Sequence, residues 1–233
     1  GDPDSGGDIS GMAERLSGDV MQIFSSAGAF TALKADGSVV SWGDSARGGV
    51  IPPSLLADLD EAVVRLASND FAFAAVTESG AVVSWGDASN GGYSRAMDDQ
   101  LASGGVEVFA SQSAFAALKQ DGSVVTWGRE SAGGDSSAVS AELSSGVVEI
   151  VSTDSAFAAL KDDGSVVSWG NPAAGGNSNL VADQLAAGVA SVTANNSTFA
   201  AYHIHAFVHS DEHPFIHPDA PPNRLAKHHQ PTH

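Results

Sequence analysis

Histidines are the residues best suited to chemistry in this 233-residue chain, and all eight lie in residues 203–233. Neutral imidazoles with nearby carboxylates are typical ligands of zinc, copper or nickel. The first two histidines are two residues apart and would share one face of a strand. The candidate metal ligands are His203, His205, His209, His213 and His217. We expect no cofactor, and a transition metal bound by this tail is the alternative.

A second interpretation of this His/Pro-rich C-terminal tail needs no metal. Five of the nine prolines lie in it, and Pro214 and Pro218 each follow a histidine directly. Proline at these places disfavours the helix on which an H-x3-H pair would converge. We therefore favour an irregular extension over a metal site.

Four tryptophans recur at steps of 43, 42 and 42 residues, each closing a near-copy of the phrase AFAALK-x-DGSVVSWG. If exposed, they would form stacking platforms for sugars or bases. At the ends of strands with a fixed period, core wedges between structural units are the better explanation. The repeat markers are Trp42, Trp85, Trp127 and Trp169, with Phe30, Phe73, Phe115, Phe157 and Phe199.

Aspartates precede the glycine of these phrases at Asp36, Asp121 and Asp163. Carboxylates bind calcium, but no spaced Asp/Asn/Gly calcium loop is present. Asp-Gly is typical of a tight β-hairpin turn, in which both residues would adopt positive φ. We therefore expect turn residues here and a solvated acidic rim from the remaining carboxylates.

Signatures of catalysis are missing from the repeated phrases. The chain has no nucleophile elbow, no phosphate-cradling loop with its lysine, no H-E-x-x-H motif and no cysteine. Residues 1–202 also hold no histidine that would activate a serine. The sequence therefore predicts a protein that is not an enzyme.

The charge of the chain limits its partners. It has 28 acidic and 10 basic residues, a net charge of -18. Nucleic acid is excluded as a partner because phosphate surfaces are bound by clustered Lys and Arg. Direct membrane insertion is excluded because no apolar run approaches the roughly 18 residues of a membrane span. The expected partner is a protein, and a basic surface would match this charge.

The repeated phrases divide the chain into tandem units. We expect one repeat domain at 1–202, with a half unit at 1–19, full units at 20–61, 62–104, 105–146 and 147–188, and a partial unit at 189–202, before the tail at 203–233. Each unit has a β-branched strand, a strand of small residues and a strand ending in Trp-Gly. The stretch that follows, such as SNLVADQLAAG, predicts one short helix per unit.

The phrase A-F-A-A-L-K-x-D-G-S-V-V-S-W-G, followed by a loop and Gly-Gly, resembles the repeat of the regulator of chromosome condensation family over about residues 20–202. The resemblance implies a β-propeller, usually seven-bladed, that serves as a protein-binding platform. One branch of that family promotes nucleotide exchange on a small GTPase, and another inhibits a bacterial hydrolase. The unit here is shorter than the usual family repeat, and no insertion specific to exchange is found.

The expected fold class is all-β with short helices. A unit of this size cannot bury its own apolar face, so its neighbours must cover it. About five units of three strands plus a short helix would form a β-propeller-like ring or arc, with a β-rich solenoid as the alternative. Because the two half units would complete one blade, we expect a closed or nearly closed ring, and an open arc is the rival.

Three functions fit these features. The first is a non-catalytic protein-protein interaction or scaffold module, such as an accessory subunit of a larger assembly. The second is a carbohydrate-binding repeat module, and the third is metal binding through the tail. The loops DSARGGVIPP, DASNGGYSR, RESAGGDSS and NPAAGGNSN differ from one another. Their divergence favours one protein partner over a repeated small ligand.

Overall fold

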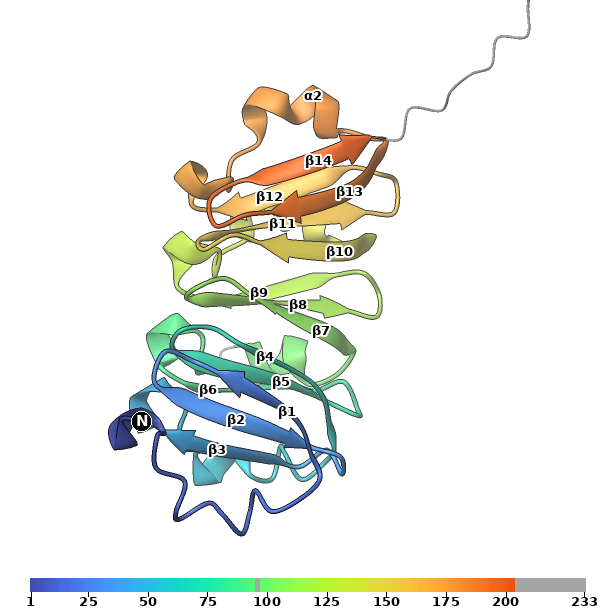
Figure 1. Cartoon of the computed structure of the whole chain (residues 1–233). Coiled ribbons are helices and arrows are strands. Elements are labelled where there is room, and N and C mark those ends of the chain that lie inside the picture. The colour runs from blue at the N-terminus through green and yellow to red at the C-terminus, as the bar shows by residue number, and fades with distance from the viewer. Residues whose placement is uncertain (95–96, 204–233) are drawn as a thin grey trace, which may run out of the picture.

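The computed structural model describes residues 1–94 and 97–203, and Figure 1 shows these as a row of small sheets. The strands are β1 (Val20–Ser25), β2 (Ala29–Lys34), β3 (Val39–Gly43), β4 (Val63–Ser68), β5 (Ala72–Thr77), β6 (Val82–Gly86), β7 (Gly105–Ala110), β8 (Ala114–Lys119), β9 (Val124–Gly128), β10 (Val147–Ser152), β11 (Ala156–Lys161), β12 (Val166–Gly170), β13 (Val189–Ala194) and β14 (Phe199–His203). The α-helices are α1 (Asp98–Leu101) and α2 (Ala182–Leu185).

Strands that are neighbours in sequence pair into antiparallel sheets. The sheets are β1-β2-β3, β4-β5-β6, β7-β8-β9, β10-β11-β12 and the two-stranded β13-β14. In every three-stranded sheet the phenylalanine of the middle strand lies opposite the tryptophan of the third, as Phe157 does opposite Trp169. The predicted fold class, an all-β tandem repeat of the propeller type, is confirmed.

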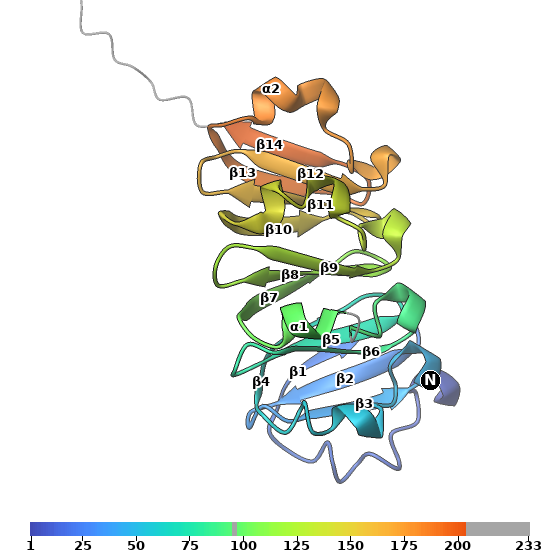
Figure 2. The same cartoon turned by 180° about the vertical axis from the view of Figure 1, so that it is seen from behind.

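The row of sheets is open. The first sheet lies at one end and the last sheet at the other in both views (Figures 1 and 2). A chain of backbone hydrogen bonds links the first turns of consecutive units: Ala27 N to Asp70 O, Asp70 N to Gln112 O, Gln112 N to Asp154 O, and Asp154 N to Asn196 O. Each unit is thus held to the next one along the chain. The expected closed ring is wrong, and the open arc is the observed form.

Residues 1–19 pack against the first sheet and do not complete the last one. Trp42 Nε1 donates to the Gly6 carbonyl at 3.2 Å. Met12 and Leu16 pack against the cluster formed by Val40 and Trp42. This half unit therefore contacts the first sheet in the same way that each later loop contacts the sheet that follows it. The composite blade expected from the two half units does not form, because the first sheet already holds this segment.

Each tryptophan fixes its own unit to the loop before it. Its Nε1 donates to the carbonyl of the first glycine of the preceding double glycine. The distances are 3.2 Å for Trp42, 3.1 Å for Trp85, 3.0 Å for Trp127 and 3.0 Å for Trp169. The indole also stacks on the phenylalanine of its unit, with ring centroids 5.4 Å apart for Trp169 and Phe157. The recurring tryptophan therefore joins two units as well as filling one.

The core lies between consecutive sheets. Ala114 and Ala116 of β8 pack with Phe157 and Ala159 of β11, because small side chains let two sheets approach closely. The exposure of the first strand in each sheet depends on whether another sheet packs against it. Ile150 of β10 is 2% exposed, whereas Ile23, at the same place in β1, is 54% exposed. Ile23 belongs to the first sheet of the row, which has no sheet before it among the described residues.

The Asp-Gly turns differ in detail from the expected two-residue hairpin. The four glycines have positive φ: Gly37 80°, Gly80 80°, Gly122 75° and Gly164 78°. The preceding residues do not, since Asp19 alone has positive φ among the described non-glycine residues. Four residues separate the paired strands, so a longer turn suffices with one left-handed residue at its third place.

The expected helix per unit is mostly a series of single turns. Only α1 and α2 are α-helical among the described residues, with four residues each. The corresponding stretch before β10 has two 3-10 turns, Ser137–Val139 and Glu142–Ser144. Neither has a side-chain cap hydrogen bond, and stretches this short gain little helical stability of their own. None of the described helices is long and apolar enough to cross a membrane.

Candidate functional site

The proposed metal ligands fall almost entirely beyond the described residues. His203 ends β14 and is half-buried. His205, His209, His213 and His217 lie outside the described residues. Within residues 1–94 and 97–203, no group of three or more histidine, cysteine or acidic side chains is placed to hold a metal ion. The tail metal site stays a prediction.

The tryptophans offer no stacking platform. The exposed fractions are 7% for Trp42, 0% for Trp85, 4% for Trp127 and 3% for Trp169. Their indole faces lie against the phenylalanines Phe30, Phe73, Phe115 and Phe157. A sugar ring or a base could reach them only if consecutive units separated.

The turn aspartates act on their own turns. Asp121 Oδ1 accepts hydrogen bonds from Ser123 N at 3.0 Å and Ser123 Oγ at 2.6 Å. Asp36 and Asp163 make the same pair of bonds with Ser38 and Ser165. The serine hydroxyl, and then the serine amide, hold the pKa of each carboxyl below the 3.8 of a free aspartate. One oxygen of each carboxyl, Oδ1, is therefore used by the turn, as expected of turn residues.

These lowered pKa values predict a loss of stability in acid. A carboxyl whose pKa is lower in the folded state stabilises the fold above its unfolded value of 3.8, and this contribution is lost as the pH falls through the folded value. We expect the urea midpoint to fall between about pH 5 and about pH 2. The variant with asparagine at Asp36, Asp121 and Asp163 should show a smaller fall, because its amides cap the turns without titrating. An equal fall in an Asp183→Asn control and the triple variant would contradict this.

Two grooves run along the free edges of third strands, between the loops that flank each strand. The first, which we call the β6 groove, is about 500 Å³ and has Val82, Val83 and Leu101 in its lining, with Asp58 and Glu61. The second, the β9 groove, is about 1060 Å³. The two occupy equivalent places in consecutive units, because Val82-Val83 and Val124-Val125 begin the corresponding strands.

The β9 groove combines apolar surface with negative charge. Tyr93 is exposed, and Met97 and Val124 are half-buried, so these lining residues present apolar surface to the groove. Its carboxylates are Asp99, Asp121, Glu130 and Asp135. Asp99 lies in α1, Asp121 in the β8-β9 turn, and Glu130 and Asp135 in the loop after β9, so three separate segments deliver these carboxylates.

Charge in the β9 groove is almost all negative. Lys119 is the cation in its described lining, and its Nζ donates to the Gln100 carbonyl at 2.6 Å. Hydrogen bonds from Ser137 hold the pKa of Asp135 below the usual aspartate value, and Asp121 is ionised for the same kind of reason. Arg95 lies outside the described residues. The groove therefore suits an extended segment with basic and apolar side chains.

A polar hollow of about 410 Å³ gathers the first turns of all five units. Its lining includes Asn69, Asp70, Gln112, Asp154 and Asn196. Sequence reasoning missed both this hollow and the β9 groove. The available signal was divergence at a fixed register: Ala27, Asp70, Gln112, Asp154 and Asn196 hold corresponding places in the ladder but differ in type.

Comparison with solved structures shows the same fold. No protein-family model and no curated protein matches the sequence. Yeast RCC1 (Prp20), solved bound to Kap60, matches with a TM-score of 0.50 and 19% identity, over 68% of this chain and 45% of that chain. The chain is thus similar to an RCC1-type repeat propeller and has that fold, while spanning less than half the length of the yeast protein.

Two further structures are similar at lower scores. Human WBSCR16 matches with a TM-score of 0.46 and 20% identity, over 66% of this chain and 48% of that chain. The CRINKLY WD40 ectodomain of the Arabidopsis thaliana receptor kinase ACR4 matches with a TM-score of 0.47 and 14% identity, over 80% of this chain and 60% of that chain.

Proposed function

We propose that this chain is a non-catalytic protein-interaction module that binds a basic, partly apolar segment of a partner protein in the β9 groove. The observation that carries the proposal is the set of four carboxylates beside the accessible apolar side chains of Tyr93, Met97 and Val124. The carboxylates are Asp99, Asp121, Glu130 and Asp135. Apolar contacts would supply affinity, and the carboxylates would select lysine or arginine and speed association.

The unequal grooves support one protein partner over a repeated glycan. A carbohydrate-binding repeat module needs similar pockets in each unit. The β6 groove has about half the volume of the β9 groove, with Asp58 and Glu61 as its carboxylates. The tryptophans, which would be the natural sugar platforms, are buried. Each groove therefore offers a different surface, which suits one partner that contacts the array asymmetrically.

The titratable groups support binding over catalysis. The pKa shifts resolved among the described residues all lower the pKa of carboxyl groups: Asp8, Asp36, Glu61, Asp121, Asp135 and Asp163. A general acid at neutral pH needs a raised carboxyl pKa or a histidine near its ordinary value. The carboxylates of the β9 groove are suited to holding a cation.

The structural comparison adds support of a limited kind. The yeast protein with the same fold was solved bound to Kap60, so a protein of this fold can have a protein partner. We extend only that general role to this chain. The basic character of the bound segment rests on the charge of the groove.

A peptide-display selection tests this function. We expect peptides selected on the intact chain to be enriched in lysine or arginine beside an apolar residue. The Asp99→Asn, Glu130→Gln double variant should bind them about 5- to 30-fold more weakly, because each exposed ion pair contributes about 0.5–1 kcal/mol. Raising the salt concentration should reduce binding to the intact chain more than binding to the variant.

The matched control carries the same loss of charge outside the groove. Glu149→Gln with Asp183→Asn removes two exposed carboxylates that do not line it. This control should bind the selected peptides as the intact chain does. Selected peptides without basic residues, or equal weakening in both double variants, would contradict the proposal.

A further inference from the structure

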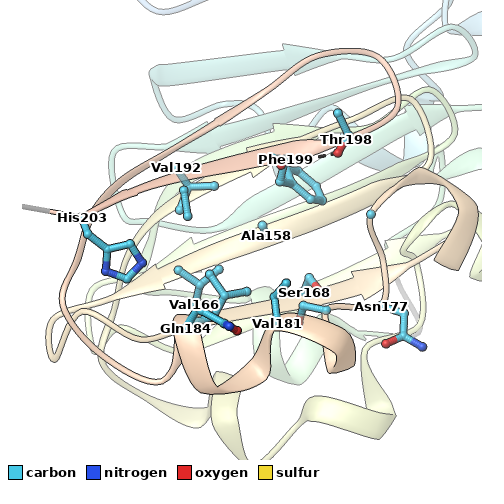
Figure 3. Close-up of a pocket in the computed structure, with 14 residues that line it drawn as sticks. Ala158, Val166, Ser168, Asn177, Val181, Gln184, Val192, Thr198, Phe199 and His203 are labelled. Carbon is cyan, nitrogen blue, oxygen red and sulfur yellow. Dashed lines mark hydrogen bonds between the residues drawn. The ribbon is translucent and has the colours of Figure 1, made fainter.

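The last unit has an unpaired strand edge beside a cavity. Its sheet consists of β13 and β14 alone within the described residues. A cavity of about 360 Å³ lies along β14, between the last unit and the one before it. Figure 3 shows Val192, Phe199 and His203 on one side of this cavity and Val166 and Ser168 on the other.

The four complete units show what occupies the equivalent place. In the fourth unit the third strand β12 pairs with β11, which places Ala158 opposite Ser168 and Phe157 opposite Trp169. Trp169 stacks on Phe157 at 5.4 Å and donates Nε1 to the Gly133 carbonyl at 3.0 Å. The occupant is a short β-branched strand that ends in Trp-Gly.

The last unit has both groups that such a tryptophan would contact, a phenylalanine ring and a glycine carbonyl. A Cβ on Gly175 would lie 2.6 Å from Phe199 Cδ2, which matches the 2.5 Å between a Cβ on Gly133 and Phe157 Cδ2. Phe199 therefore lies against Gly175 as Phe157 lies against Gly133. The last unit thus has the same stacking ring and the same glycine as the fourth unit, and the Gly175 carbonyl corresponds to that of Gly133.

Burial shows that this place is open. Ala159 is 0% exposed, whereas Ala201, its counterpart in β14, is exposed and lines the cavity. Phe157 is fully buried, whereas Phe199 is only half-buried. Apolar side chains of β14 are thus left without the cover that a third strand gives their counterparts in the complete units.

The sequence that follows β14 is a poor match for this place. In register, Ala206 stands where Gly164 adopts a φ of 78°, a conformation costly for alanine. Asp211 stands where Trp169 stacks on its phenylalanine, and a carboxylate against an apolar ring loses its hydration. By residue type, the sequence that follows β14 therefore does not match the third strand of the complete units.

We propose that the cavity beside β14 is a strand-accepting site for a separate polypeptide carrying a segment of the type Val-Val-Ser-Trp-Gly. The segment adds to β14 as an antiparallel third strand, with its tryptophan on Phe199 and its indole N–H on the Gly175 carbonyl. Main-chain bonds supply affinity, and the tryptophan supplies specificity. This site uses none of the carboxylates of the β9 groove, so it does not depend on the function proposed above.

The test uses the intact chain and a fluorescent peptide of sequence Ser-Val-Val-Ser-Trp-Gly-Asn, which copies residues 165–171. We expect a polarisation increase on binding and slower hydrogen exchange of the β14 amides. A peptide with alanine in place of tryptophan should bind about tenfold more weakly or worse. Ala201→Glu, which fills the cavity side of β14, should abolish binding.

The control variant alters the same strand on its other face. Ala200 is exposed and alternates with Ala201 along β14, so Ala200→Glu should bind the peptide as the intact chain does. Circular dichroism checks that both variants fold. No binding to the intact chain, equal binding by both variants, or binding that appears only in a version ending at His203 would overturn the proposal.

Discussion

Replacing Trp85 by alanine is expected to lower the free energy of unfolding by about 3–5 kcal/mol. Trp85 is 0% exposed, and its indole stacks on Phe73 with centroids 5.7 Å apart. Its Nε1 also donates to the Gly48 carbonyl at 3.1 Å. The substitution leaves a cavity between the first two units and removes the hydrogen-bond donor that joins them, so both units should lose stability.

Urea unfolding followed by circular dichroism, together with hydrogen exchange, measures this loss. Trp85→Phe separates its two parts, because phenylalanine keeps much of the ring packing and removes the N–H; we expect it to cost less than alanine. Leu180→Ala is the surface control, since Leu180 is 100% exposed, and should change stability by about 0.5 kcal/mol or less. Exchange that accelerates equally in β13 would contradict a loss centred on the first two units, because repeat units contact mainly their neighbours.

The sequence predicted those features that one unit determines by itself. Phenylalanine and tryptophan 12 residues apart, as at Phe157 and Trp169, pair across β11 and β12, because the turn length between the two strands is the same in each unit. The prediction that neighbouring units cover each unit's apolar face is also confirmed, since Ala114 and Ala116 pack with Phe157 of the next unit. The phrase repeated in each unit is thus enough to predict the strand order and the repeat-propeller fold class.

The curvature of the array was beyond sequence reasoning. It depends on the step between units, which backbone hydrogen bonds such as Asp70 N to Gln112 O set. Such bonds have no residue signature, because any side chain can stand at these positions. Closure was inferred from the two half units, but the segment that includes Gly6 is held by Trp42 of the first sheet. The sequence of a half repeat therefore does not indicate whether it packs on the first sheet or on the last one.

The β9 groove was hidden for a related reason. Asp99 and Glu130 are 31 residues apart in sequence and meet at one groove only because consecutive loops flank the same strand edge. The acidic composition predicted a solvated rim of carboxylates but not its position on the fold. The divergent loops were the usable signal, since residues that differ between units at corresponding places are free of the constraints that keep the core uniform.

Replacing Gly133 by alanine is expected to be among the most destabilising small substitutions in the chain. A Cβ there would lie 2.5 Å from Phe157 Cδ2, and the residue has a φ of 95°. Overpacking costs about 1–3 kcal/mol, and a left-handed conformation in a residue other than glycine costs about 1–3 kcal/mol. The first glycine of each pair lets the loop approach the next unit, so both penalties fall on a contact between units.

Three further glycine-to-alanine variants separate the two penalties. Gly18 has a φ of 93° with nothing within 4 Å, so it isolates the backbone cost. Gly134 lacks a positive φ, but its Cβ would lie 2.4 Å from the Gly128 carbonyl oxygen, so it isolates the clash. Gly11 has neither and is the baseline. Urea midpoints should place Gly11→Ala nearest the unchanged chain, with Gly18→Ala next and Gly133→Ala well below both. If Gly133→Ala matched Gly18→Ala, Phe157 would be free to move aside, and the double glycine would be needed for its backbone conformation more than for close contact between units.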